Sequence, residues 1–173
     1  MKLIVGAGLM LALLLPAAGP ALAQKTILSS GNNAMVAPEY AAGPRFQNGL
    51  DFMQQKNFAE AAKAFQDVID HDDRNANANY MMGVAQIGLN DLVRAGNYLR
   101  VAVKSNPKLV DAHVKLGYVE AKLGNADAAK EQRAALEKMD KACKGKCPDA
   151  APLSAGMTLI DKGLAEGPAP KAG

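Results

Sequence analysis

The chain has 173 residues, of which 49% are hydrophobic, and it carries 20 lysine and arginine residues against 17 aspartate and glutamate residues. The basic excess is small, and the lysine and arginine residues do not form clusters interleaved with aromatic residues. The sequence therefore lacks the electrostatic signature of a nucleic-acid-binding protein. Abundant alanine and the lack of tryptophan favour closely packed helices in one domain with a modest core.

Residues 1–23 predict a secretory signal peptide. Lys2 precedes a leucine-rich run that ends at Pro16, and the small residues of the ALA sequence at 21–23 suit a cleavage site. The run is shorter than the ~20 residues needed to span a bilayer, so a retained anchor helix is the less favoured alternative. We expect a mature chain that begins near Gln24, is secreted across the inner membrane of a bacterial double envelope into the periplasm, and does not insert into a membrane.

Two segments at the ends of the mature chain have the composition of flexible chain. Residues 24–41 and residues 166–173 are rich in glycine, proline, alanine, serine and asparagine. Such segments lack the apolar residues needed to form a core. We expect a flexible N-terminal linker and a disordered C-terminal tail.

The region between these segments contains a regular repeat, which is marked by the equally spaced Gly49, Gly83 and Gly117. An alanine follows each glycine at a constant interval, and an asparagine or aspartate that could cap a helix lies between the two; these residues are Ala61, Ala95, Ala129, Asn57, Asp91 and Asn125. Each unit is therefore predicted as a helix A, a turn and a capped helix B. The glycine allows close approach of helix B, with the alanine as its expected contact.

This pattern resembles the tetratricopeptide repeat, a helix-turn-helix unit of about 34 residues. The residues that fit the family frame are the three glycines, the three alanines, Phe52, Phe65, Leu99 and Pro107. The resemblance implies an all-α fold, a short α-solenoid of three repeats at about 42–75, 76–109 and 110–143. The sequence departs from the family at several usually large or apolar positions, which hold Arg45, Asn79, His113, Gln86, Glu120 and Arg133.

A capping helix is predicted after the third repeat, within residues 144–165. Leu153, Met157, Ile160 and Leu164 form one apolar stripe at helical spacing over residues 150–164. A terminal helix of this kind closes the open apolar face at the end of a repeat array.

Cys143 and Cys147 lie just before this helix, and in an exported protein they most simply form a disulfide that sets its approach. A zinc site or a thiol-exchange site is the less favoured alternative, because zinc prefers four ligands and the CKGKC spacing differs from that of redox motifs.

The resemblance implies a partner-binding groove on the concave side of the array, lined by helix A. The nine residues expected there are all apolar or aromatic: Phe46, Leu50, Met53, Tyr80, Val84, Ile87, Val114, Tyr118 and Ala121. A second apolar stripe, including Met82 and Leu116, would face helix B. Since a surface helix usually needs only one apolar side for packing, the other side is the candidate groove. Two alternatives remain: the groove is filled by residues 35–40 or by a second copy of the chain, or these residues are simple core.

We expect no enzyme, cofactor or metal site. His71, near Asp72 and Asp73, is better explained by the C-terminal dipole of its helix than by metal binding, and His113 is better explained as a packed side chain. No phosphate-binding or dinucleotide motif is present. The predicted function is a scaffold that binds an apolar segment of another envelope protein. The alternative is a self-associating structural subunit.

Overall fold

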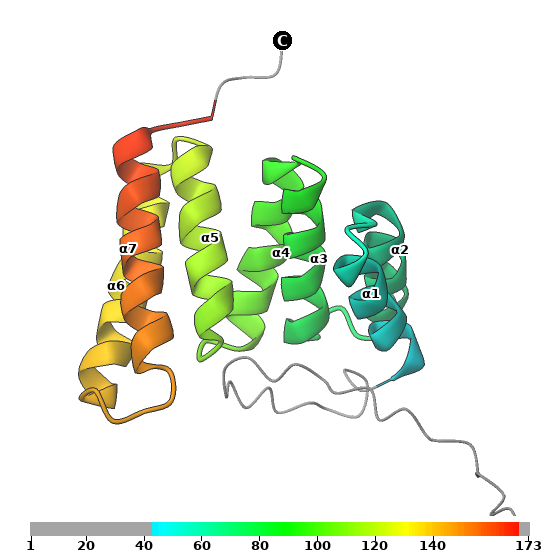
Figure 1. The fold of residues 1–173 in the computed structure, drawn as a ribbon, viewed down its shortest axis with the longest axis horizontal. Coiled ribbons are helices and arrows are strands. Elements are labelled where there is room, and N and C mark those ends of the chain that lie inside the picture. Colours follow the sequence, from blue (N-terminus) through cyan, green and yellow to red (C-terminus); the bar gives the residue numbers. More distant parts are fainter. Residues whose placement is uncertain (1–42, 170–173) are drawn as a thin grey trace, which may run out of the picture. The chain divides into compact units, whose positions relative to one another are not determined.

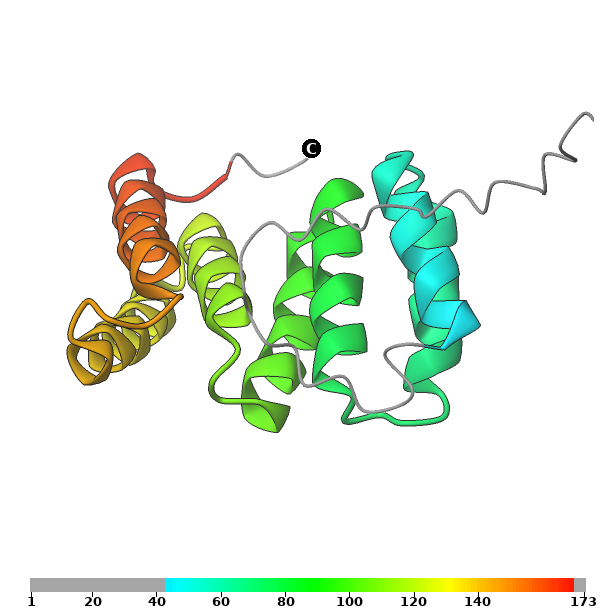
Figure 2. The ribbon, with the colours of Figure 1, turned by 60° about the horizontal axis from the view of Figure 1, so that its bottom comes forward.

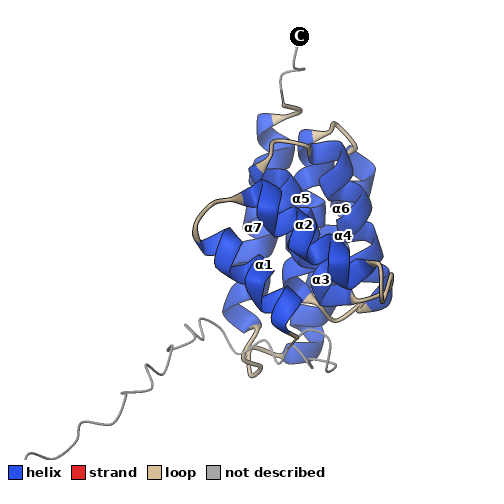
Figure 3. Cartoon of the chain, turned by 90° about the vertical axis from the view of Figure 1, so that its right-hand side faces the viewer, coloured by secondary structure: helices blue, strands red, loops and turns tan. Residues whose placement is uncertain are grey.

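The computed structural model describes residues 43–169, which all belong to one compact unit of the chain. These residues form seven α-helices and no strand (Figures 1 and 3). The helices are α1 (Pro44–Gln54), α2 (Phe58–Ile69), α3 (Ala76–Gly88), α4 (Leu92–Ser105), α5 (Val110–Lys122), α6 (Ala126–Cys143) and α7 (Ala150–Glu166). The all-α solenoid is confirmed. The predicted signal peptide and flexible N-terminal linker, with residues 170–173, lie outside the described residues.

The first six helices form three hairpins, α1/α2, α3/α4 and α5/α6, and each hairpin packs against the next through α2 with α3 and α4 with α5. Helix α7 packs against both α5 and α6, as Figures 1 and 2 show. Buried Leu153 and Ile160 lie on this contact side of α7. The end of the third hairpin is thus covered by a helix of the same chain.

The recurring glycines allow a bulky side chain of helix B to pack closely against the backbone of helix A. A Cβ atom on Gly83 would lie 2.6 Å from Leu99 Cγ, and one on Gly49 would overlap the Phe65 ring. Ala61 and Ala95 are fully buried, and the atoms nearest Gly49 and Gly83 come from the large residue one helical turn beyond each of these two alanines. The expected alanine contact is present at Gly83, where the Ala95 carbonyl oxygen would lie 3.4 Å from the added Cβ, but the large side chain lies closer to the glycine.

The third hairpin solves the same packing problem differently. Its equivalent of Phe65 and Leu99 is Arg133, which cannot fill an apolar site, and a Cβ on Gly117 would instead overlap Ile160 of α7. Arg133 Nε donates a hydrogen bond of 2.6 Å to Oδ1 of Asp161, which follows Ile160 on α7. Helix α7 therefore supplies the side chain that helix B lacks.

Only one of the three predicted B-helix caps forms. Asp91 accepts a hydrogen bond from the Arg94 backbone at 2.9 Å, whereas Asn57 and Asn125 accept none as caps. The Asn125 amide instead donates to Glu120 Oε2 at 2.8 Å. The Asn125 side chain therefore binds a buried carboxylate instead of capping α6. The capping pattern in the sequence does not predict this partner.

Among the polar residues that depart from the family frame in the later repeats, Asn79, His113 and Glu120 are buried and paired, whereas Gln86 is buried with its Oε1 atom unpaired among the described residues. Asn79 donates from its amide to the carbonyls of Asp73 and Asn75 at 3.0 and 2.9 Å. Glu120, with 1% of its surface exposed, accepts from Arg100 of α4 at 2.7 Å. These bonds satisfy groups whose burial would otherwise be costly, and the Arg100–Glu120 pair joins the second hairpin to the third.

Candidate partner-binding surface

The nine predicted groove residues lie on the first helices of the hairpins, α1, α3 and α5, and differ in exposure. Phe46 and Ala121 belong to the core, with 4% and 3% of their surfaces exposed. The others are half-buried: Leu50, Met53, Tyr80, Val84, Ile87, Val114 and Tyr118. Phe46 packs against Phe65 with ring centroids 5.4 Å apart, so it stabilises the first hairpin.

Several half-buried residues also pack between hairpins. Leu50 and Met53 contact the apolar cluster that contains Ala78 and Met82 of α3. Tyr80 and Ile87 contact the cluster that contains Leu99 of α4 and Leu116 of α5. A helix inside a repeat array has neighbours in its own hairpin and in the next, so its second apolar side is partly consumed by packing. The rule of one apolar side for a surface helix underestimates this demand.

On α5, the C-terminal helix lies directly over the predicted groove residues. A Cβ on Gly156 would overlap Val114, and one on Gly163 would lie 3.2 Å from Ala121 Cβ and 3.4 Å from Tyr118 Cδ2. The two glycines are seven residues apart on α7, which places them on one face and lets α7 approach α5 closely. That spacing was the sequence signal for a close helix contact at this face.

The end of α5 is bound by the last residue of α7 and by the chain just beyond it. Lys122 Nζ lies 2.6 Å from Glu166 Oε2 and 5.8 Å from the centre of the Tyr118 ring. The Lys122 hydrogen bond holds the pKa of Glu166 below its usual value, and the same bond raises the pKa of Lys122. The Ala169 backbone N–H also donates to the Lys122 carbonyl at 2.8 Å. Of the predicted tail, residues 166–173, Glu166 thus belongs to α7 and Ala169 is held against α5.

Tyr80 is strongly enclosed for a half-buried residue. Its burial, reinforced by the negative charge of Asp111, raises the pKa of its hydroxyl far above the ordinary range, so the side chain is neutral. It contacts apolar clusters on α4 and α5. Tyr80 is therefore as much a packing residue as a candidate contact for a partner.

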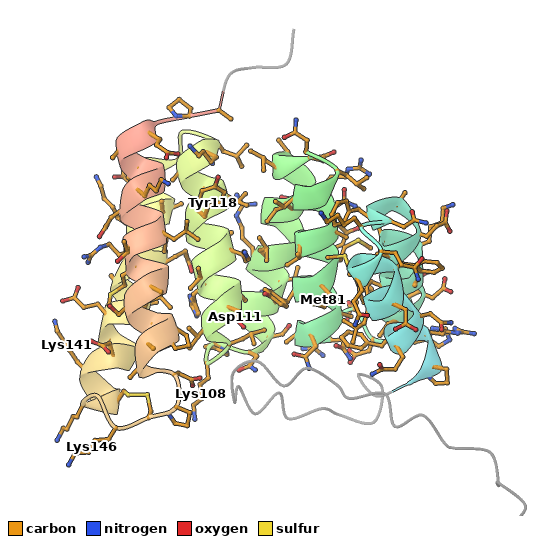
Figure 4. All side chains as sticks on the ribbon, in the orientation of Figure 1. Met81, Lys108, Asp111, Tyr118, Lys141 and Lys146 are labelled. Carbon is orange, nitrogen blue, oxygen red and sulfur yellow. A yellow bond between two sulfur atoms is a disulfide. The ribbon has the colours of Figure 1, made fainter. Side chains whose placement is uncertain are left out.

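Three equivalent residues form what we call the central apolar row: Leu50, Val84 and Tyr118. They stand one repeat length apart, so they occupy the same position on α1, α3 and α5, and all three are half-buried. Figure 4 labels Tyr118 on α5 and Met81 on α3. The row is the part of the predicted surface that keeps both apolar character and exposure on all three helices.

Hollows lie elsewhere on the described part of the chain. One of about 760 Å³ lies between α2 and α4, with Arg74, Tyr98 and Lys104 among its lining residues. Another of about 660 Å³ lies by the α3–α4 turn, at the exposed side chains Leu89 and Val93. Sequence periodicity predicted neither, because both are formed by side chains of different helices.

The described residues contain no group of three histidine, cysteine, aspartate or glutamate side chains that could hold a metal ion. His113 is buried, with Nδ1 2.8 Å from Gln132 Oε1 and Nε2 3.1 Å from the Pro107 carbonyl. His71 Nδ1 lies 2.7 Å from the Asp67 carbonyl, at the end of α2. Cys143 and Cys147 form a disulfide with Cα atoms 5.3 Å apart. Over residues 43–169, no helix is long and apolar enough to cross a membrane.

Stacked helical hairpins define the class of this protein as a helical-repeat protein. The model of the family described as tetratricopeptide repeat matches residues 46–110, from α1 to the first residue of α5, so this part of the chain consists of tetratricopeptide repeats. No curated protein matches the chain in sequence.

Two solved structures share the fold. The TPR2B domain in a pHsp70 complex of yeast Sti1 has a TM-score of 0.58 and 17% identity, with 68% of this chain and 94% of that chain covered. The first TPR of Spaghetti (RPAP3), bound to the HSP90 peptide SRMEEVD, has a TM-score of 0.56 and 18% identity, with coverages of 70% and 90%.

Proposed function

We propose that this protein is a non-enzymatic adaptor that binds an apolar peptide or protein segment of another envelope protein along the central apolar row. The observation that carries the proposal is the row itself: three equivalent positions on three helices are apolar, yet none is fully buried. An apolar segment laid on a helical surface is a recurring mode of peptide recognition. Export to the periplasm, predicted from residues 1–23, would place the partner in the envelope.

The chemistry of the row favours an apolar ligand over an acidic one. The SRMEEVD peptide bound to the similar Spaghetti domain contains three carboxylate side chains in seven residues. In this chain the central row is uncharged, and Lys122 at the end of α5 is already paired with Glu166. A carboxylate-rich peptide would therefore find no free cation along the row itself.

Paired substitutions to aspartate test the proposal. We expect Val84→Asp to abolish partner capture from an envelope extract by the mature protein, because a charge in the row repels an apolar ligand. Val93→Asp is the matched control, since Val93 is 63% exposed on α4 and outside the row. Circular dichroism should show unchanged helix content in both variants. Equal capture by the two variants would refute binding at the row.

Sedimentation of the mature protein distinguishes this adaptor from the self-associating alternative. An adaptor with a free row should remain a monomer across protein concentrations. A concentration-dependent dimer that Val84→Asp dissociates and Val93→Asp does not would assign the row to self-association instead.

A further inference from the structure

The hollow between α2 and α4 is lined mainly by the second helices of the hairpins, with Asn79 contributed by α3, and its lining includes none of the three residues of the central apolar row. Its volume of about 760 Å³ falls in the range of roughly 300–1,000 Å³ that is usual for ligand sites. Its residues along α4 run from Asn97 to Ser105. That span is about 12 Å of helix, which matches about four residues of an extended chain.

One part of the lining is apolar. Ile69 of α2 is buried, with 9% of its surface exposed, and half-buried Val101 and Tyr98 are contributed by α4. The Tyr98 hydroxyl donates to Gln66 Oε1 of α2 at 3.2 Å, which bridges the two helices and holds the ring. These three side chains offer a pre-formed contact for an apolar or aromatic side chain.

The other part of the lining is cationic. Arg74, in the α2–α3 turn, pairs with Asp73 at 4.0 Å, and both side chains are more than 85% exposed. An exposed pair at that distance contributes little, so Arg74 is available to a ligand. The side chain of Lys104, near the C-terminal end of α4, has no hydrogen bond or ion pair with the described residues. With Asp73 included, the lining keeps an excess of one positive charge.

We propose that this hollow is a second docking site, which binds an extended peptide segment carrying an aromatic side chain next to carboxylates. The aromatic ring packs on Ile69, Val101 and Tyr98, while the carboxylates pair with Arg74 and Lys104. Charge complementarity and the adjacent apolar wall together favour a ligand of this kind over two others. A purely polar anion would leave the wall exposed to water. A neutral apolar segment would leave both cations unpaired.

A blocked, fluorophore-labelled pentapeptide with phenylalanine flanked by two glutamates tests the site by fluorescence anisotropy with the mature protein. Lys104→Glu and Arg74→Glu should each weaken binding roughly tenfold. Lys108→Glu is the matched control, because this exposed lysine of the α4–α5 turn, labelled in Figure 4, is outside the lining. Replacing the two glutamates of the peptide by lysines should abolish binding to the unmodified protein.

The double variant Arg74→Glu/Lys104→Glu gives a specificity test that loss of fold cannot mimic, because it should bind the lysine peptide better than the glutamate peptide. Equal weakening by Lys104→Glu and Lys108→Glu would overturn the proposal, as would absence of binding to the unmodified protein. Binding that appears only after Glu39→Lys would identify the chain's own Glu39 and Tyr40 as the occupant, and would also overturn it. Val84→Asp should leave the affinity for the glutamate peptide unchanged. The test of this hollow and the test of the central apolar row can therefore fail independently of each other.

Discussion

At the scale of single residues, each helical glycine has a role set by the side chain opposite it. Gly83 is required because Leu99 occupies the space above it, whereas a Cβ on Gly96 would meet Val119 Cγ1 at 3.5 Å, an ordinary contact. Both glycines are buried inside helices of the second hairpin. They are therefore a matched pair for separating packing from helix propensity.

We expect Gly83→Ala to lower the free energy of unfolding by about 1–3 kcal/mol, since the overpacking cost exceeds the gain in helix propensity. Gly96→Ala should raise the free energy of unfolding by about 0.5–1 kcal/mol, because alanine loses less backbone entropy than glycine on folding. Urea unfolding followed by circular dichroism measures both values. The packing explanation fails if the two variants change stability in the same direction.

At the scale of elements, α7 is part of the third hairpin's core rather than a separate lid. Ile160 is fully buried above Gly117, and neighbouring Asp161 pairs with Arg133 at 2.6 Å. The disulfide closes the connection between α6 and α7 within five residues. A chain-entropy gain of only about 2 kcal/mol is expected for so short a loop, so most of the docking energy comes from packing.

Truncation of Ile160 tests this role of α7. Ile160→Ala should cost about 2–5 kcal/mol of stability through the lost contacts and the cavity that remains. Met157→Ala, at a half-buried position of the same helix, should cost less. Amide hydrogen exchange should show lower protection in both α5 and α7 of the Ile160 variant. Loss of protection confined to α7 would contradict a shared core.

At the scale of the whole molecule, stability depends on the contacts between successive hairpins, as in other repeat arrays. The Arg100–Glu120 pair is one such contact, and its carboxylate is buried while the guanidinium is half-exposed. It couples α4 to α5 by a charge-assisted bond of 2.7 Å. Loss of one partner should therefore weaken cooperation between the second and third hairpins.

We expect Arg100→Met to lower the free energy of unfolding by about 1–3 kcal/mol, because Glu120 then keeps a buried charge with one bond fewer. Adding Glu120→Gln should recover part of this loss, since the unpaired charge is removed. Arg94→Met, which breaks the pair between Arg94 and the N-cap residue Asp91 at the solvent-facing start of α4, should change stability by less than about 0.5 kcal/mol. A two-step urea transition in Arg100→Met would show that the hairpins have uncoupled. Equal costs for Arg100→Met and Arg94→Met would contradict the coupling.

Sequence periodicity predicted the repeats more completely than it predicted the candidate surface. The equal spacing of Gly49, Gly83 and Gly117 identified the hairpins and the family, because glycine in a helix usually marks a close contact. It did not identify the side chain that fills the space above Gly117, since Ile160 lies beyond the end of the third repeat, on α7. A periodic pattern reports which face is apolar, but not which neighbour covers it.

The candidate surface shows the same limit. Its apolar residues were visible at regular spacing, but the burial of Phe46 and Ala121 and the cover that Gly156 and Gly163 bring to α5 depend on neighbouring helices. The hollow between α2 and α4 has no sequence signature, because Arg74 and Lys104 belong to different repeats.

The amino-acid sequence by itself determined the helical class, the repeat length and the stripe of α7, because these follow from local spacing along one helix. Tertiary structure alone decided which apolar side chains are buried, which buried polar groups are paired, and where cations meet an apolar wall. Exposure and pairing are properties of surfaces that distant segments create together, so they exist only after the helices have packed.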